Sequence, residues 1–265
     1  MTEIKEFYSN YADKIVKKRF DSESPLRKYV HNAQYQSILN YVEPGMKVLD
    51  IGCGEGVMSV LMAKKGAKVT GCDLSKPNIE ACIAYAKRNY VKVEFVIGDA
   101  EVVPFGDNSF DLVVSSHVLE HLPDFDRGLQ EIMRVTKKRA VIAIPTICNP
   151  CSLVQVGRGA FWCCGKRDLV ALPWGFLKMV LAYITGKDGV NEKYAGNNVP
   201  HVFRFPRVLK EKLKKYGYTL VEYEASSVCL PHFNFFLGLT KKLDCYKKKP
   251  VLRNFGYGTT FIIQK

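Results

Sequence analysis

The chain has 265 residues, 47% of them hydrophobic, and a formal net charge of +13. A chain of this length can bury a large core without disulfide bonds, and its odd number of cysteines, nine, argues against a disulfide framework. The N-terminus shows no apolar signal core, and no apolar run is long enough to span a bilayer, so we expect a cytoplasmic protein.

Much of the positive charge falls in two C-terminal stretches, residues 204–218 and 240–249. A net charge of this size attracts nucleic acid, anionic lipid and acidic metabolites, and it does not choose among them. Solvated helix faces also produce such runs. Charge alone therefore does not predict nucleic-acid binding.

In chain order, residues 1–40 predict helices with aromatic anchors, after which apolar strands alternate with helices. The strands are continuously apolar, which is typical of a parallel sheet covered on both faces and predicts an α/β fold. Residues 147–200 break the rhythm and are interpreted as an insertion. We expect strands over residues 47–52, 67–75, 93–100, 110–118, 139–146, 218–226 and 257–265, and helices over residues 56–66, 76–90, 124–138 and 205–217.

The first strand leads into a glycine-rich turn, DIGCGEG, that starts at Asp50. Glycines at positions 52, 54 and 56 leave space and backbone N–H groups for a ligand beyond the carboxyl end of the strand. The spacing G-x-G-x-G differs from the dinucleotide fingerprint G-x-G-x-x-G. Asp50 would repel a pyrophosphate and attract an ammonium group, so a nicotinamide dinucleotide is the disfavoured alternative.

Acidic residues also follow the next two strands. Asp73 comes about twenty residues after the turn, where a carboxylate can accept both hydroxyls of a ribose. Asp99 is placed to accept a hydrogen bond from an adenine amino group, beside the flat surface and N–H of Ala100. Ser116 and His117 end the fourth strand at the same edge of the sheet. The predicted ligand is a nucleoside with a cationic, amino-acid-like tail.

Four segments in this order, VLDIGCGEG, GCDLS, GDAEVVPFGDNSFDLVVSSHVLEHLPD and EIMRVTKKRAVIAIP, resemble the class I S-adenosylmethionine-dependent methyltransferases. The sequence is most similar to the small-molecule branch that includes the ubiquinone and menaquinone biosynthesis enzymes, over about residues 41–145. The resemblance implies a Rossmann-like fold with helices on both faces of a seven-stranded sheet, parallel except for its last strand in sequence. It also implies S-adenosylmethionine as cofactor and S-adenosylhomocysteine as product.

The resemblance divides the chain into four expected regions. These are an N-terminal helical lid (1–40), a Rossmann-like cofactor-binding core (41–146), an inserted cap over the substrate (147–200) and the completion of the core sheet (201–265). It places Asp50 near the methionine amino group, packs Leu74 on the adenine and makes Tyr8 and Tyr11 lid candidates. The cofactor-binding residues that we predict are Asp50, Gly52, Cys53, Gly54, Asp73, Leu74, Asp99, Ala100, Ser116 and Tyr11.

Methyl transfer from a sulfonium is an in-line displacement, so the protein mainly positions and desolvates the reactants. A hydroxyl acceptor also needs a base, for which His117 and His121 are the candidates, although His121 could instead only brace its loop. Related quinone O-methyltransferases can carry an E-x-x-E-H metal constellation here. This chain has His117 in place of the first acid, and we predict no metal.

The insertion contains a helix-length apolar segment, residues 172–186, that is too short to span a membrane. We expect a buried cap helix; the alternative is a hydrophobic pocket or an interfacial helix for a lipid-like acceptor. Nearby basic residues would then suit an anionic surface. They are Lys166, Arg167, Lys178 and Lys187. A zinc site at Cys148, Cys151, Cys163 and Cys164 is disfavoured, because the second pair is adjacent.

We therefore predict an S-adenosylmethionine-dependent methyltransferase that acts on a hydroxyl of a small, partly apolar metabolite, with a carbon or an amine as the less favoured acceptor. Two alternatives stay open: an RNA methyltransferase that uses the basic surface, and a cofactor-binding protein without catalysis. A cysteine nucleophile, Cys151, is disfavoured because it follows the fifth strand rather than the fourth.

Overall fold

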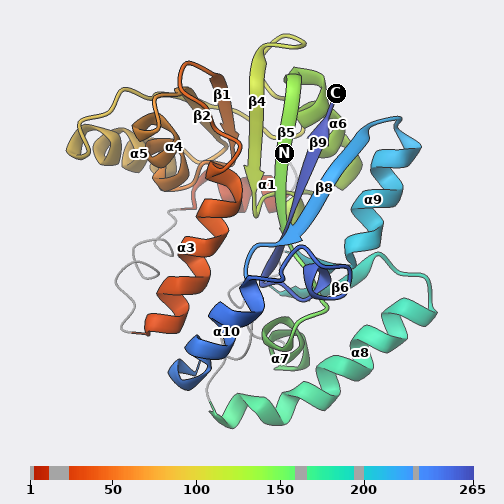
Figure 1. The fold of residues 1–265 in the computed structure, drawn as a ribbon. Coiled ribbons are helices and arrows are strands. Elements are labelled where there is room, and N and C mark those ends of the chain that lie inside the picture. Colours follow the sequence, from red (N-terminus) through yellow and green to blue (C-terminus); the bar gives the residue numbers. More distant parts are fainter. Residues whose placement is uncertain (1–2, 12–23, 159–165, 194–199, 229–232) are drawn as a thin grey trace. The chain divides into compact units, whose positions relative to one another are not determined.

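The computed structural model describes residues 3–11, 24–158, 166–193, 200–228 and 233–265. The chain divides into two compact units. The first unit comprises Met1–Phe20, Tyr35–Ile142 and Ile262–Lys265, and the second comprises Asp21–Gln34 and Ala143–Phe261. Figure 1 shows the elements of both units.

The central feature is a seven-stranded mixed sheet with the strand order β3-β2-β1-β4-β5-β9-β8. Strand β1 is parallel to both of its neighbours, β2 and β4, and β2 is parallel to β3. The prediction of a Rossmann-like α/β fold is confirmed. The strands are β1 (Lys47–Ile51), β2 (Lys68–Asp73), β3 (Glu94–Ile97), β4 (Phe110–Ser116), β5 (Thr136–Pro145), β8 (Thr219–Ala225) and β9 (Gly258–Gln264).

In the first unit, β3 lies at the edge of the sheet and has no buried residue. Strands β1, β2 and β4 are buried along most of their length, as a parallel sheet with two covered faces requires. In β4, for example, Leu112, Val113 and Val114 are all nearly inaccessible. The predicted helix over residues 124–138 extends three residues too far at its C-terminal end, since α6 ends at Val135. Thr136, the first residue of β5, has extended backbone, and its hydroxyl donates to the carbonyl of Ile132.

Local sequence signals explain where the helices begin. Ser75 caps α5 by accepting the N–H of Asn78, and Asp124 caps α6 by accepting the N–H of Arg127. The helices are α1 (Glu3–Ser9), α3 (Pro25–Leu39), α4 (Val57–Lys64), α5 (Lys76–Arg88), α6 (Phe125–Val135), α7 (Pro150–Arg158), α8 (Leu172–Ile184), α9 (Pro206–Lys215) and α10 (Leu237–Asp244).

The second unit contains most of the inserted segment. Here β6 (Gly189–Lys193) pairs antiparallel with β7 (Pro200–Arg204), a ribbon that the sequence analysis does not predict. Cys151 is buried in an apolar cluster with Leu26, Val30 and Tyr257. The cysteines at positions 163 and 164 lie outside the described residues.

Helix α8 forms as predicted, but the expectation that it is a buried cap helix is wrong. Trp174 and Ile184, for example, are 54% and 72% exposed. The apolar composition of a helix does not determine which other elements pack against it, so composition alone did not predict the exposure of α8. No helix in the described part of the chain has the length and apolar character needed to cross a membrane.

Candidate functional site

The glycine turn after β1 has a backbone that other residues adopt only with strain. Gly52, Gly54 and Gly56 have φ angles of 69°, 53° and 77°. A Cβ on Gly52 would lie 2.2 Å from Cγ2 of Val118. The N–H groups of Gly52 and Cys53 donate to the carbonyl of Cys72, at 2.7 and 3.1 Å, and so attach the turn to the end of β2.

Asp50 lies directly before this turn and is 2% exposed. Its carboxylate accepts a hydrogen bond of 2.5 Å from Oγ of Ser59 on α4. Burial raises the pKa of Asp50 to about 7, and the nearby charge of Asp73 also raises it. A buried acid of this kind is suited to a cationic ligand group, because a nearby cation would stabilise its ionised form.

Asp73 is the last residue of β2 and connects the two strand ends. One carboxylate oxygen accepts the N–H of Gly54 at 2.8 Å. The other accepts the N–H of Ser75 at 2.9 Å and Nδ2 of Asn78 at 3.3 Å. These bonds fix the carboxylate beside the glycine turn, with part of its surface accessible.

Asp99, which follows β3, contacts a residue that the sequence analysis missed. Nζ of Lys5 on α1 lies 2.6 Å from Asp99 and 2.6 Å from Glu101. Burial alone would lower the pKa of Lys5, but its hydrogen bonds to the two acids raise the pKa overall. No sequence signal could have identified Lys5, because a lysine in a short polar helix is usually solvated.

The N-terminal segment also contacts residues that follow β2 and β4. The carbonyl of Tyr11 accepts a hydrogen bond of 2.5 Å from Oγ of Ser75. The rings of Tyr8 and His121 lie 5.4 Å apart, measured between centroids. Together with Lys5, these contacts hold the N-terminal segment against the sheet edge that carries the predicted cofactor residues.

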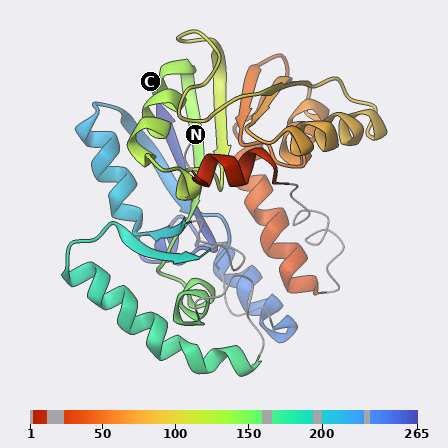
Figure 2. The same ribbon diagram turned by 180° about the vertical axis from the view of Figure 1, so that it is seen from behind.

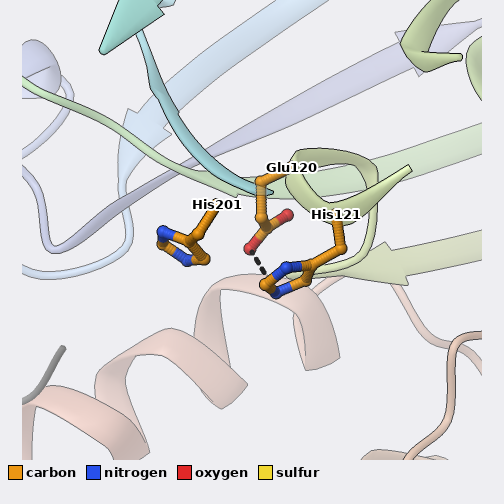
Figure 3. A group of neighbouring side chains, drawn as sticks. All are labelled: Glu120, His121 and His201. Carbon is orange, nitrogen blue, oxygen red and sulfur yellow. Dashed lines mark ion pairs between the residues drawn. The ribbon is translucent and has the colours of Figure 1, made fainter. Parts of the chain in front are cut away.

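His117 follows β4 and has a φ angle of 58°, an uncommon value for a residue other than glycine. Its Nδ1 lies 3.1 Å from Oε1 of Glu120. Nε2 of His121 lies 4.0 Å from the same oxygen, and Figure 3 shows this second pair. The side chain of Glu120 is fully buried. If Nδ1 donates to this carboxylate, the acceptor nitrogen of a neutral His117 is Nε2.

Glu120 is the second residue that the sequence analysis missed as part of the site. The signal was available, since an acid three residues after His117 can meet it in a helical turn. Residues 119–121 do form a short 3-10 helix, η1 (Leu119–His121). Glu120 therefore contacts the two histidines that are the predicted base candidates.

The remaining predicted residues occupy the same region of the first unit. Leu74 and Ala100 follow β2 and β3, and Ser116 ends β4; all three are partly exposed. Cys53 is buried, with its Sγ 3.7 Å from Sγ of Cys82. The contact with Cys82 is the main cause that raises the pKa of Cys53 well above its usual value, and burial is the second cause. Cys53 is therefore a thiol at neutral pH.

The carboxyl ends of four neighbouring strands, β1 to β4, thus carry one cluster of glycines, acids and histidines. Residues 49–144 of the chain match the family model described as "Methyltransferase domain". The chain has the fold of the class I S-adenosylmethionine-dependent methyltransferases.

Among curated proteins, the chain is similar to a ubiquinone biosynthesis O-methyltransferase of Pelagibacter ubique, with 35% identity over 102 residues, which are 38% of this chain and 42% of that protein. It is 38% identical over 109 residues to a demethylmenaquinone methyltransferase of Corynebacterium efficiens, covering 41% of this chain and 45% of the relative. The chain therefore matches less than half of the length of these relatives.

A solved structure with the same fold is the magnesium protoporphyrin IX methyltransferase of Synechocystis PCC 6803 with bound S-adenosylmethionine. The TM-score is 0.60 at 14% sequence identity, and the match covers 100% of this chain and 98% of that one. At this identity the likeness concerns the fold alone.

Proposed function

We propose that the chain is an S-adenosylmethionine-dependent methyltransferase that acts on a hydroxyl of a small, partly apolar metabolite. The observation that carries this proposal is the row of acids Asp50, Asp73 and Asp99 around one glycine turn. Asp50 and Asp73 lie at the carboxyl ends of β1 and β2, and Asp99 lies just beyond β3; the three strands are neighbours and run parallel. The matched family and the relatives with methyltransferase activity support the same class of reaction.

The residues fit the cofactor group by group. Asp50, buried and with a raised pKa, matches the ammonium group of the methionine moiety. Asp73 matches the ribose diol, and Asp99 matches the adenine amino group, as each has a carboxylate oxygen at the edge of the sheet. When bound, S-adenosylmethionine supplies a methyl group already activated on a sulfonium.

Because the cofactor carries the activation, the remaining tasks of the protein are to exclude water, orient the acceptor and remove its proton. Nε2 of His117 takes the proton of the acceptor hydroxyl in this proposal. Glu120 is a positioning residue, which holds Nδ1 of His117 at 3.1 Å and thereby fixes the ring and its tautomer. His121 is the second candidate for the base.

The test is methyl transfer by His117→Asn, measured as S-adenosylhomocysteine released with phenolic, quinol, sugar and lipid acceptors. Asparagine tolerates a positive φ, so this variant removes the base at little backbone cost. We expect kcat to fall by about 10²- to 10⁴-fold, with unchanged cofactor affinity. Glu120→Gln, the variant of the positioning residue, should retain more activity.

An unchanged kcat in His117→Asn would remove this histidine from the mechanism. If the wild type binds the cofactor but produces no S-adenosylhomocysteine with any acceptor class, the alternative of a non-catalytic cofactor-binding protein replaces the proposal.

A further inference from the structure

The outward side of α8 is apolar and exposed. Six of its side chains, here called the outer face of α8, are each between 43% and 72% exposed. Figure 1 and Figure 2 both draw α8 on the outside of the second unit. The outer face consists of Trp174, Phe176, Leu177, Leu181, Tyr183 and Ile184.

The inward side of α8 fixes this orientation. Lys178 is the one charged residue of the helix, and it points inward, where Nζ lies 2.8 Å from both the carbonyl of Val156 and Oε1 of Glu192. A Cβ on Gly175 would lie only 1.8 Å from the carbonyl oxygen of Leu153, so the backbones of α7 and α8 are in contact. Rotating α8 to bury its outer face would break both the close packing and the ion pair.

The composition of the outer face suits a lipid surface. It has no charged residue, and it includes tryptophan and tyrosine, which favour the boundary between lipid and water. With 13 residues, α8 is shorter than the roughly 20 that span a bilayer. A helix of this kind is suited to lie in the plane of the interface, with its apolar side among the acyl chains.

The charge of the second unit adds an argument for the kind of lipid. This unit contains 20 of the 39 Lys and Arg residues but only 9 of the 26 Asp and Glu residues, so it carries +11 of the net charge of +13. Lys187, three residues beyond the end of α8, is exposed, as are Lys241 and Lys242 on α10. Basic residues near an interface are attracted to anionic headgroups.

We infer that the outer face of α8 is a docking surface for an anionic lipid bilayer, on which the protein binds peripherally. The apolar side chains enter the interface, and the basic second unit is attracted to the negative surface. This inference does not depend on the proposed methyl transfer, because its residues belong to neither the glycine turn nor the histidine pair.

The test uses Trp174 as its own reporter. The chain has two tryptophans, so Trp162→Phe leaves Trp174 as the single tryptophan. The full chain is mixed with vesicles of phosphatidylcholine alone, or of phosphatidylcholine with phosphatidylglycerol, and binding is measured by co-sedimentation. We expect binding to the mixed vesicles, a blue shift of the Trp174 emission, and weaker binding at high salt and on phosphatidylcholine alone.

The decisive variant is Leu177→Ser, Leu181→Ser and Ile184→Ser combined, which leaves the reporter in place. We expect it to keep the wild-type circular dichroism, because the three side chains are exposed, and to bind mixed vesicles about tenfold or more weakly. The control is Ile83→Ser with Val221→Ser, which removes apolar side chains that are 53% and 52% exposed on α5 and β8. It should bind like the wild type.

Two results would overturn the inference. One is a folded wild type that does not bind mixed vesicles, or that binds them no better than the triple variant does. The other is a dimer in sedimentation equilibrium that the triple variant dissociates, since a second copy of the chain would then cover the outer face of α8.

Discussion

At the residue scale, Gly52 meets two separate constraints, and Gly45 provides a comparison that meets only one. Both have positive φ, at 69° and 82°, but a Cβ on Gly45 would have nothing within 4 Å. Gly45→Ala should therefore lower the free energy of unfolding by only roughly 1–2 kcal/mol, the cost of a left-handed backbone at a residue with a Cβ. Gly52→Ala should lower the free energy of unfolding by about 1–3 kcal/mol more than Gly45→Ala does, because the new methyl group collides with Val118. Urea unfolding measures both, and equal losses would contradict the packing argument.

Asp50 gives a pH-dependent prediction. Its pKa is raised from 3.8 to about 7 in the folded protein, so the folded state retains the proton to a higher pH than the unfolded state does. The stability linked to this proton is complete below about pH 4 and is lost as the pH rises to about 7. Asp50→Asn removes the titration while keeping an acceptor for Ser59.

We therefore expect the free energy of unfolding of Asp50→Asn to be close to that of the wild type at pH 4. At pH 8 it should exceed the wild-type value by roughly 2–4 kcal/mol. The same variant should bind S-adenosylmethionine more weakly, because it cannot pair with the ammonium group. A stability difference that does not change between pH 4 and pH 8 would show that folding does not raise the pKa of Asp50.

At the element scale, α1 is a short helix that depends on a few polar contacts with the sheet edge. None of its own residues is buried, so tertiary contacts such as that of Lys5 must hold it in place. Lys5→Met should increase amide hydrogen exchange over residues 3–9 by about tenfold, while overall stability changes by less than about 1 kcal/mol.

The matched control for this experiment is Lys64→Met, because Lys64 at the end of α4 donates its hydrogen bond to Asn89 at the end of α5 rather than to a residue that contacts α1. It should leave the exchange of α1 unchanged. If α1 exchanges at the same rate with and without Lys5, the ion pair with Asp99 and Glu101 is not what anchors the helix.

The elements differ in how well the sequence predicts them. The seven strands of the main sheet were predictable, because long apolar runs in a parallel sheet leave a strong signal. The ribbon of β6 and β7 was not, since half of its ten residues are polar or charged and they form no apolar run. The contact of Glu120 with His117 could have been predicted from their spacing of three residues. The contacts of Lys5 arise from tertiary geometry, and the exposure of α8 depends on what packs against it, so periodicity reports neither.

At the scale of the whole molecule, charge and chemistry are divided between the two units. The first unit carries the acids, glycines and histidines of the candidate site, and its net charge is only +2, since it contains 19 Lys and Arg against 17 Asp and Glu. The second unit carries the remaining +11 and the outer face of α8. Net positive charge alone therefore gives no argument for nucleic-acid binding at the candidate site.

The central claim is that the acids around the glycine turn bind S-adenosylmethionine. Calorimetric titration of the full chain with S-adenosylmethionine and S-adenosylhomocysteine tests it most directly, on the wild type and on Asp73→Ala. We predict micromolar binding of both ligands by the wild type, reduced at least tenfold in the variant. A folded wild type that binds neither ligand, or an Asp73→Ala variant that binds as tightly as the wild type, would contradict the assignment of this site.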